Sequence, residues 1–265
     1  MSEVAQRTGF ARNHRRIAAF GLGVVVVGLL AAALAGPASQ WGLWSYQTGF
    51  VIVRWAVYGV AAGAVLSLLA LIANAAVHKS QFLKRSSMAL VAIAVAAVAI
   101  YVPYAASRPG NPPIHDITTD IENPPVFVDV LPLREQTKAT NTAEYLREWP
   151  RGEGVIDVPA LQKAAFPDIQ PVVLDLPPAE AFVRAAAAVR RMNWTVVAEA
   201  PDEGRIEAFD RTAWFGFIDD VVIRVRPDGT GSRIDVRSVS RVGGGDRGLN
   251  AKRIRAYVKA LTAES

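Results

Sequence analysis

A run of glycines between two arginines is the part of the sequence whose residue types and spacing best fit ligand chemistry. The segment reads Ser240-Arg-Val-Gly-Gly-Gly-Asp-Arg-Gly248. Consecutive glycines allow successive backbone N–H groups to form an anion-binding nest, and a helix that follows adds its positive N-terminal end. Flanking arginines can bind phosphate or carboxylate with two hydrogen bonds each. The candidate anion-binding residues are Arg237, Ser240, Arg241, Gly243, Gly244, Gly245, Asp246 and Arg247.

The same glycines also fit a tight turn from a strand into a helix, with Asp246 or Asn250 helping to cap that helix. This structural alternative stays open beside the anion site. The lysine and the strand context of a P-loop are missing from the segment, so no nucleotide cofactor is predicted.

Cysteine and histidine usage limits the other chemistries. The chain contains no cysteine, which excludes a thiolate nucleophile, a disulfide framework and a cysteine-ligated metal. His115 is the one histidine of three that follows the apolar N-terminal part, so a site built from several histidines is not expected and no metal cofactor is predicted. A catalytic triad of His115 with Ser238 or Ser240 lacks the G-x-S-x-G elbow. We interpret His115, next to Asp116, as a structural contact.

The positive charge of the chain is concentrated at one end. Residues 1–106 hold eight of the 29 lysines and arginines and one of the 24 acidic residues, a net charge of +7, whereas the rest of the chain has a net charge of −2. A nucleic-acid-binding protein needs a basic face that releases counterions. No nucleic-acid partner is therefore predicted, and the basic excess is typical of the flanks of membrane spans.

Three long apolar stretches predict a multi-pass membrane anchor over residues 1–106. Residues 17–35, 55–77 and 87–106 contain no charged side chain, and each is long enough to cross a bilayer core of about 30 Å. The mean hydropathy of +0.22 agrees with this interpretation. The first stretch also resembles a cleavable signal peptide, although its apolar run is longer than usual.

The distribution of basic residues predicts the orientation of the anchor. Four arginines precede the first stretch, and residues 78–85 between the second and third stretches hold two lysines and an arginine. By the positive-inside rule, both segments stay in the cytoplasm. We therefore expect an inner-membrane protein with a cytoplasmic N-terminus and an extracytoplasmic C-terminal domain. Membrane lipid is one expected partner. The small-xxx-small pair Gly59 and Gly63 indicates helix packing within the chain or a homodimer contact.

Residues 107–168 form a proline-rich arm and residues 169–265 an α+β domain in this interpretation. Nine of the sixteen prolines lie in the arm, which predicts an extended segment with one short helix near Thr142–Glu148. Its isoleucines and valines are too numerous for a free linker, so we expect the arm to pack on the domain. The domain pattern is β-α-β-β-β-β-α, which predicts an antiparallel sheet with helices on one face, a two-layer sandwich.

Alternation along residues 220–226 and 232–239 places arginines on the face away from the helices. A four-residue loop, Pro227–Thr230, is expected to join these strands, which would put Asp220 opposite Arg237 and Arg224 opposite Arg233. An anionic partner is predicted to bind on this face. Replacing Arg237 and Arg241 with alanine is expected to weaken that binding and leave the fold intact.

Two strings of residues resemble a known family. Phe217-Ile-Asp-Asp-Val-Val and, above all, Val236-Arg-Ser-Val-Ser-Arg-Val-Gly-Gly-Gly-Asp-Arg-Gly-Leu-Asn-Ala-Lys-Arg-Ile254 resemble the domain of unknown function 1499. Ile114–Asp120 and Ala164–Gln170 are similar to the membrane-anchored form in proteobacteria. The resemblance covers residues 115–263 and implies no established activity. Many members have an Asn-Cys-Val-Ser segment where this chain has His115-Asp-Ile117, so no role of that cysteine transfers.

The sequence indicates a function in the cell envelope. No convergent nucleophile, metal set or cofactor fingerprint is visible, whereas an arginine-bearing sheet face and a glycine-rich loop are. We therefore expect a binding or accessory protein that recognises an anionic head group or an envelope protein partner. The alternative is an envelope enzyme that acts on an anionic substrate at the loop of residues 241–248, with Arg241, Asp246 and Arg247 as the acting side chains.

Overall fold

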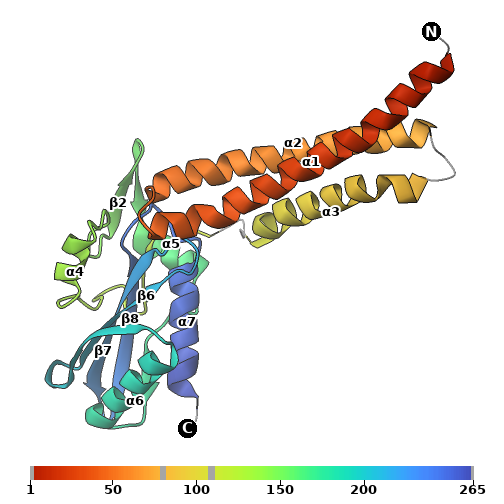
Figure 1. Cartoon of the computed structure of the whole chain (residues 1–265). Coiled ribbons are helices and arrows are strands. Elements are labelled where there is room, and N and C mark those ends of the chain that lie inside the picture. Colours follow the sequence, from red (N-terminus) through yellow and green to blue (C-terminus); the bar gives the residue numbers. More distant parts are fainter. Residues whose placement is uncertain (1–2, 78–81, 107–110, 264–265) are drawn as a thin grey trace. The chain divides into compact units, whose positions relative to one another are not determined.

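A computed structural model describes residues 3–77, 82–106 and 111–263. The chain divides into two compact units, Met1–Ser107 with Trp214–Gly216, and Arg108–Ala213 with Phe217–Ser265. Each unit is described by itself, and Figure 1 shows the elements of both.

The first unit contains three helices, α1 (Glu3–Gln40), α2 (Tyr46–Val77) and α3 (Phe82–Ala106). Helices α1 and α2 run side by side (Figure 1). A Cβ atom added at Gly63 would lie 2.6 Å from the carbonyl oxygen of Gly21, whereas a Cβ atom at Gly59 would meet nothing within 4 Å. Gly63 therefore serves packing between α1 and α2 inside the chain, and Gly59 does not.

Two helical segments, Asn13–Gln40 and Tyr46–Ala75, are long and apolar enough to cross a membrane. The prediction of three such spans is therefore met for two. The apolar part described in α3, Ser86–Tyr101, is shorter, and a span requires about 20 residues. Of the basic segment predicted on the cytoplasmic side, residues 78–81 lie outside the described residues.

The second unit is built on an antiparallel sheet with strand order β1-β8-β7-β6-β5, in which β4 also pairs with β8. Two helices, α6 (Pro178–Arg191) and α7 (Leu249–Thr262), accompany the sheet. The element order from residue 172 onward is the predicted β-α-β-β-β-β-α. The strands are β1 Asp116–Thr118, β4 Val172–Leu174, β5 Thr195–Ala200, β6 Arg205–Arg211, β7 Ile218–Asp228 and β8 Gly231–Ser240, with the 3-10 turn η2 Pro201–Glu203 between β5 and β6.

The proline-rich segment before β4 contains more regular structure than the sequence indicates. It forms β1, helix α4 (Leu131–Gln136), the hairpin of β2 (Glu148–Arg151) and β3 (Gly154–Asp157), and helix α5 (Val158–Ala165). The prediction of a helix near Thr142–Glu148 is wrong, because residues 142–147 are irregular. Helices α4 and α5 each have a proline in their first turn, Pro132 and Pro159, where the missing N–H is not needed.

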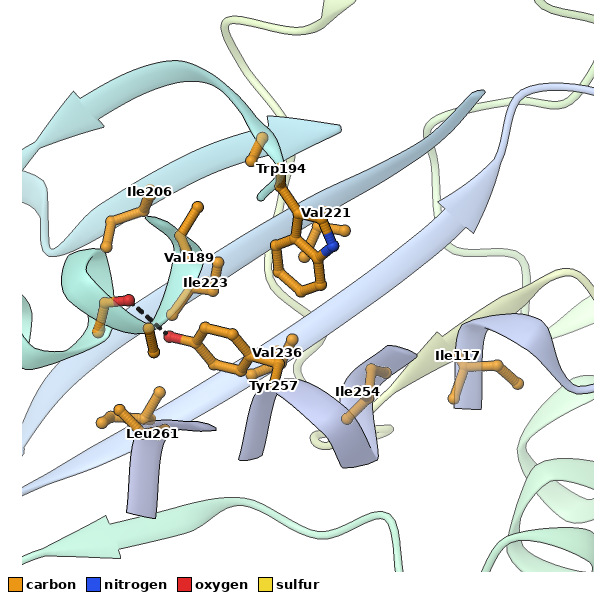
Figure 2. Packing of buried hydrophobic residues seen from close by; sticks show 14 of the residues in the cluster. Ile117, Val189, Trp194, Ile206, Val221, Ile223, Val236, Ile254, Tyr257 and Leu261 are labelled. Atoms are coloured by element: carbon orange, nitrogen blue, oxygen red, sulfur yellow. Dashed lines mark hydrogen bonds between the residues drawn. The ribbon is translucent and has the colours of Figure 1, made fainter. Parts of the chain in front are cut away.

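The hydrophobic core lies between the sheet and the helices α6 and α7. Figure 2 shows Tyr257 of α7 among side chains of the sheet and of α6. The ring of Tyr257 stacks on Trp194 with centroids 5.5 Å apart, and its hydroxyl donates to the carbonyl oxygen of Ala185 at 3.2 Å. Ile114 and Ile117, from the segment before β4, belong to the same core.

Replacing Tyr257 with phenylalanine removes this hydrogen bond and preserves the stacked ring. We expect the free energy of unfolding to fall by about 0.5–1.5 kcal/mol, the net contribution of one internal hydrogen bond. Chemical denaturation of the full chain in detergent micelles measures the difference. An unchanged free energy of unfolding would show that the hydroxyl contributes nothing to stability.

The β7–β8 hairpin has a tighter turn than predicted. Asp228 pairs with Gly231, so the loop contains Gly229 and Thr230, and Gly229 adopts a φ of +60°, which glycine reaches without strain. The prediction of a four-residue loop is therefore wrong, and the predicted strand pairs are shifted by two residues. Asp220 lies opposite Val239, and Arg224 lies opposite Asp235. A shift of two residues keeps every side chain on its predicted face.

Candidate functional site

Three arginines gather around two aspartates on the sheet face away from α6 and α7. We call this set the arginine cluster; it consists of Arg224, Arg226, Arg233, Asp120 and Asp235. Asp235 is fully buried and accepts from Arg224 at 2.9 Å, from Arg226 at 2.8 Å and from Arg233 at 2.9 Å. Arg226 and Arg233 are directly opposite each other in the β7–β8 register, so their repulsion must be offset by the carboxylates.

Asp120, two residues after β1, completes the arginine cluster. Its Oδ2 atom accepts from Arg224, Arg226 and Arg233 at 3.2, 3.3 and 2.9 Å. Desolvation by burial works to raise the pKa of Asp120, but the backbone N–H of Asn123 and the positive charges of Arg233 and Arg224 outweigh it, so the pKa lies below its ordinary value of 3.8. By formal charge, the three arginines and two aspartates of the cluster leave one positive charge in excess.

The lowered pKa of Asp120 makes a prediction about stability and pH. An ionised carboxylate with a depressed folded-state pKa stabilises the fold above its unfolded pKa, and this contribution is lost as the pH falls through the folded-state value. Asp120→Asn is therefore expected to lower the free energy of unfolding at neutral pH, and the difference from wild type should shrink below about pH 4.

Denaturation of both proteins between neutral pH and pH 2 measures this difference. Asp202→Asn, at an exposed position in η2, is the control for the loss of a surface carboxylate. A difference in the free energy of unfolding between Asp120→Asn and wild type that stays constant down to pH 2 would contradict the conclusion that the ionised carboxylate of Asp120 stabilises the folded domain.

Three members of the arginine cluster, Asp120, Arg226 and Arg233, line a cavity of about 550 Å³. The cavity lies between the cluster, the segment after β1 and the helix α5. Asp157 caps α5 by accepting from the backbone N–H of Ala160 at 2.9 Å, and Gln162 of the same helix bonds both backbone groups of Thr118 in β1. The lining residues are Thr119, Asp120, Ile121, Glu122, Asn123, Gln162, Lys163, Phe166, Ile169, Gln170, Pro171, Arg226 and Arg233.

The cavity has donors that the rest of the domain does not use. Arg226, a lining residue, bonds Asp120 and Asp235 through Nη2 alone. Its Nη1 group makes no hydrogen bond among the described residues, and its Nε atom is buried without a partner among them. Lys163 is exposed on α5 and lines the same cavity. Unused guanidinium and ammonium donors at one cavity are the groups that recognise phosphate or carboxylate.

The structure places Arg237 in the interior, away from this cavity. Arg237 is 2% exposed and donates to both oxygens of Asp116 at 2.9 and 2.7 Å. Its guanidinium lies over the ring of Phe127, 5.1 Å from the centroid, and also donates to the carbonyl oxygens of Pro125 and Ala143. Every edge of the group is therefore engaged inside the protein.

Arg241 is likewise held inside the domain. It donates to Asp220 at 2.6 Å, and Arg134 of α4 donates to the same carboxylate at 2.5 Å. Asp220 is fully buried, so it forms a buried triad with Arg134 and Arg241. Ser240, also buried, accepts from Asn250 at 3.0 Å.

The glycine-rich loop makes the turn from β8 into α7. The carboxylate of Asp246 accepts from the backbone N–H groups of Gly248 at 2.8 Å and Asn250 at 2.6 Å, as the capping alternative predicts. Burial raises the pKa of Asp246. The backbone of Arg247 is left-handed, with a φ of +56°. The carbonyl oxygen of Gly244 accepts a hydrogen bond from the side chain of Arg151 in β2 at 3.1 Å. The glycine-rich loop therefore contacts both the proline-rich segment and helix α7.

The spacing of Gly243, Gly245 and Gly248 also matches G-x-G-x-x-G, the fingerprint of dinucleotide-binding loops. That fingerprint requires a parallel βαβ unit. Among the strands that the structure describes, β8 is antiparallel to all its neighbours, so the loop lacks that context.

His115 lies beside β1 and packs edge-on against Trp149 with centroids 4.6 Å apart. Burial lowers the pKa of His115. The hydroxyl of Ser238 bonds the side chain of Asn250 at 2.7 Å, and Asp116 is bound by Arg237. Ser238 and Asp116 are therefore engaged away from His115, whose Nδ1 atom has no hydrogen-bond partner among the described residues. Within the described part of the chain, no group of three His, Asp or Glu side chains could hold a metal ion.

The sequence pattern indicates Arg224, Arg226, Arg233 and Asp235 on one face, but not Asp120 or Lys163. Asp120 follows Ile114–Thr119 without a periodic signal, and Lys163 lies in a segment predicted to be extended. Residues 116–261 match the family described as Protein of unknown function (DUF1499). A search of curated proteins gives no match. The matched residues cover more than half of the chain and include the arginine cluster and the whole cavity lining, and the chain belongs to the DUF1499 family.

Proposed function

We propose that this protein is a membrane-anchored binding protein whose C-terminal domain recognises an anionic group at the cavity beside the arginine cluster. The observation that carries the proposal is the excess of positive charge at a cavity of about 550 Å³: three arginines share two aspartates, and Lys163 adds a fourth positive charge. A charged cavity of this kind attracts anions and binds them through charge-assisted hydrogen bonds.

The anchor in this proposal is formed by the apolar helices of the first unit. Two helices of sufficient length and composition support it, and we extend it to α3 as a third span. The N-terminal arginines favour a cytoplasmic N-terminus, which would place the C-terminal domain outside the cytoplasmic membrane. In this proposal the helices of the domain form one layer on its sheet. An anionic head group or an acidic patch of an envelope protein would then be within reach.

Removing single positive charges at the cavity tests the function. Arg226→Gln is expected to preserve the fold, because two arginines then remain for two aspartates, and Lys163→Gln removes an exposed charge. Each change should weaken the binding of inorganic phosphate roughly tenfold or more, since a hydrogen bond to a charged group contributes about 1.5–3 kcal/mol.

Calorimetric titration of the full chain in detergent micelles measures the dissociation constants. The matched controls are Arg211→Gln and Lys252→Gln, both at exposed positions of the domain outside the cavity lining. Wild-type protein that binds no phosphate, or controls that lose as much affinity as the cavity variants, would contradict the proposal.

A further inference from the structure

The cavity is larger than a single oxyanion requires. Its volume of about 550 Å³ lies within the range of about 300–1,000 Å³ that holds small-molecule ligands. Nine of the thirteen lining residues are polar or charged, whereas cavities for apolar ligands are mostly hydrophobic. The size and polarity of the cavity favour a hydrophilic molecule over both a bare ion and an acyl chain.

The charges at the cavity match those of a phosphate monoester. The cavity lining holds Arg226, Arg233 and Lys163 with Asp120 and Glu122, and Arg224 and Asp235 complete the arginine cluster beside it. Glu122 is paired with Arg147 at 2.9 Å, so the formal charges of these groups leave two positive charges. A phosphate monoester carries a charge of about −1.5 to −2 at neutral pH. The phosphate would therefore neutralise the surplus, and the unused donors of Arg226 and Lys163 would bind its oxygens.

The other lining groups suit a ring that carries hydroxyl groups. The exposed side-chain amide of Asn123 makes no hydrogen bond among the described residues, and Gln170 uses only its Nε2 group, which donates to Pro167. These amides can donate to hydroxyl groups and accept from them. The apolar part of the lining offers a surface for C–H groups; it is formed by Ile121, Phe166, Ile169 and Pro171.

We infer that the cavity binds a sugar phosphate, with the phosphate at Arg226, Arg233 and Lys163 and the sugar hydroxyls at Asn123 and Gln170. This inference rests on the proposed anion-binding function and adds the chemical class of the ligand. The ligand is either a soluble sugar phosphate or a lipid head group that carries a phosphate monoester on a hydroxylated ring, because both present the same groups to the cavity.

The test compares three probes on the full chain in phosphatidylcholine nanodiscs: inorganic phosphate, glucose and glucose 6-phosphate. We expect glucose 6-phosphate to bind at least about tenfold more tightly than inorganic phosphate, a difference equal to one step of about 1.4 kcal/mol. Glucose alone should bind more weakly than either. Asn123→Ala should remove most of the advantage of glucose 6-phosphate and leave the affinity for inorganic phosphate unchanged, whereas Lys163→Gln should weaken both.

Nanodiscs that contain phosphatidylinositol 4-phosphate, whose head group carries a phosphate monoester on a hydroxylated ring, distinguish the two sources of the ligand. If the head group occupies the cavity, glucose 6-phosphate should bind more weakly to the chain in these nanodiscs than in phosphatidylcholine alone; an unchanged affinity would assign the cavity to a soluble sugar phosphate. Equal affinities for inorganic phosphate and glucose 6-phosphate, or an Asn123→Ala variant that keeps the full advantage, would overturn the inference and leave the anion-binding function standing. Failure of inorganic phosphate to bind would instead overturn that function.

Discussion

Replacing Asp220 with alanine is expected to destabilise the domain by about 3–5 kcal/mol, the usual cost of removing one partner of a buried ion pair. Asp220 is fully buried, and Arg134 and Arg241 both donate to it. Without this carboxylate, two guanidinium groups would stay in the interior with no counter-charge. Because domains are stable by only about 5–15 kcal/mol, this loss would remove a large share of the free energy of unfolding and should shift the unfolding midpoint to a much lower denaturant concentration.

Chemical denaturation of the full chain in detergent micelles measures the loss, with Asp202→Ala at an exposed position as the control. A second variant keeps the explanation specific: Asp220→Leu combined with Arg134→Met and Arg241→Met removes all three charges together. Replacing a complete buried ion triad with apolar residues is often neutral, so this triple variant should be more stable than Asp220→Ala. The reverse order of stabilities would show that unpaired charge is not the cause.

The second large effect is expected for Arg237→Ala. The change would leave Asp116 without its bidentate partner and would remove a guanidinium that packs over Phe127 and Tyr145. The expected loss is again about 3–5 kcal/mol. This expectation replaces the one drawn from the sequence, that alanine at Arg237 and Arg241 leaves the fold intact, because both side chains are buried.

A double variant that removes both charges of the pair tests the reason for this loss of stability. Arg237→Met with Asp116→Asn removes both charges and keeps side chains of similar size, and it should recover a large part of the stability lost in Arg237→Ala. Arg211 is exposed, and its side chain has no hydrogen bond or ion pair within the described part of the chain, so Arg211→Ala should stay within about 0.5 kcal/mol of wild type. If Arg237→Ala unfolds at the same denaturant concentration as wild type, the buried pair with Asp116 does not hold the domain together.

Local patterns determined how much of the fold could be predicted. Alternation in β7 and β8 and the helical stripe of α6 are properties of neighbouring residues, so the sequence indicated them and their order along the chain correctly. The hairpin register was missed by two residues, because Pro227-Asp-Gly-Thr230 fits a turn of two residues as well as one of four. The helix α5 was missed because prolines mark the first turn of a helix as well as an extended segment.

The arrangement of the charged side chains could not be predicted from one sequence. Asp116 and Arg237 are 121 residues apart, and Asp120 and Arg224 are 104 residues apart. No periodicity connects positions at such separations. The sequence placed the arginines on the correct sheet face, but only the fold shows that carboxylates from the proline-rich segment neutralise Arg237 completely and the arginine cluster in part.

The pairing of β1 with β8 has a consequence for the time course of folding. β1 lies directly beside the last strand of the sheet, and Asp116 pairs with Val239. The 121 residues between Asp116 and Arg237 take roughly 6–24 s to synthesise at about 5–20 residues per second. Until β8 emerges, Asp116 and the isoleucines near it have no partner strand. The nascent chain therefore exposes an unpaired, apolar segment for several seconds. Unpaired strand edges are prone to aggregate during such a period, and a chaperone would have to bind within it.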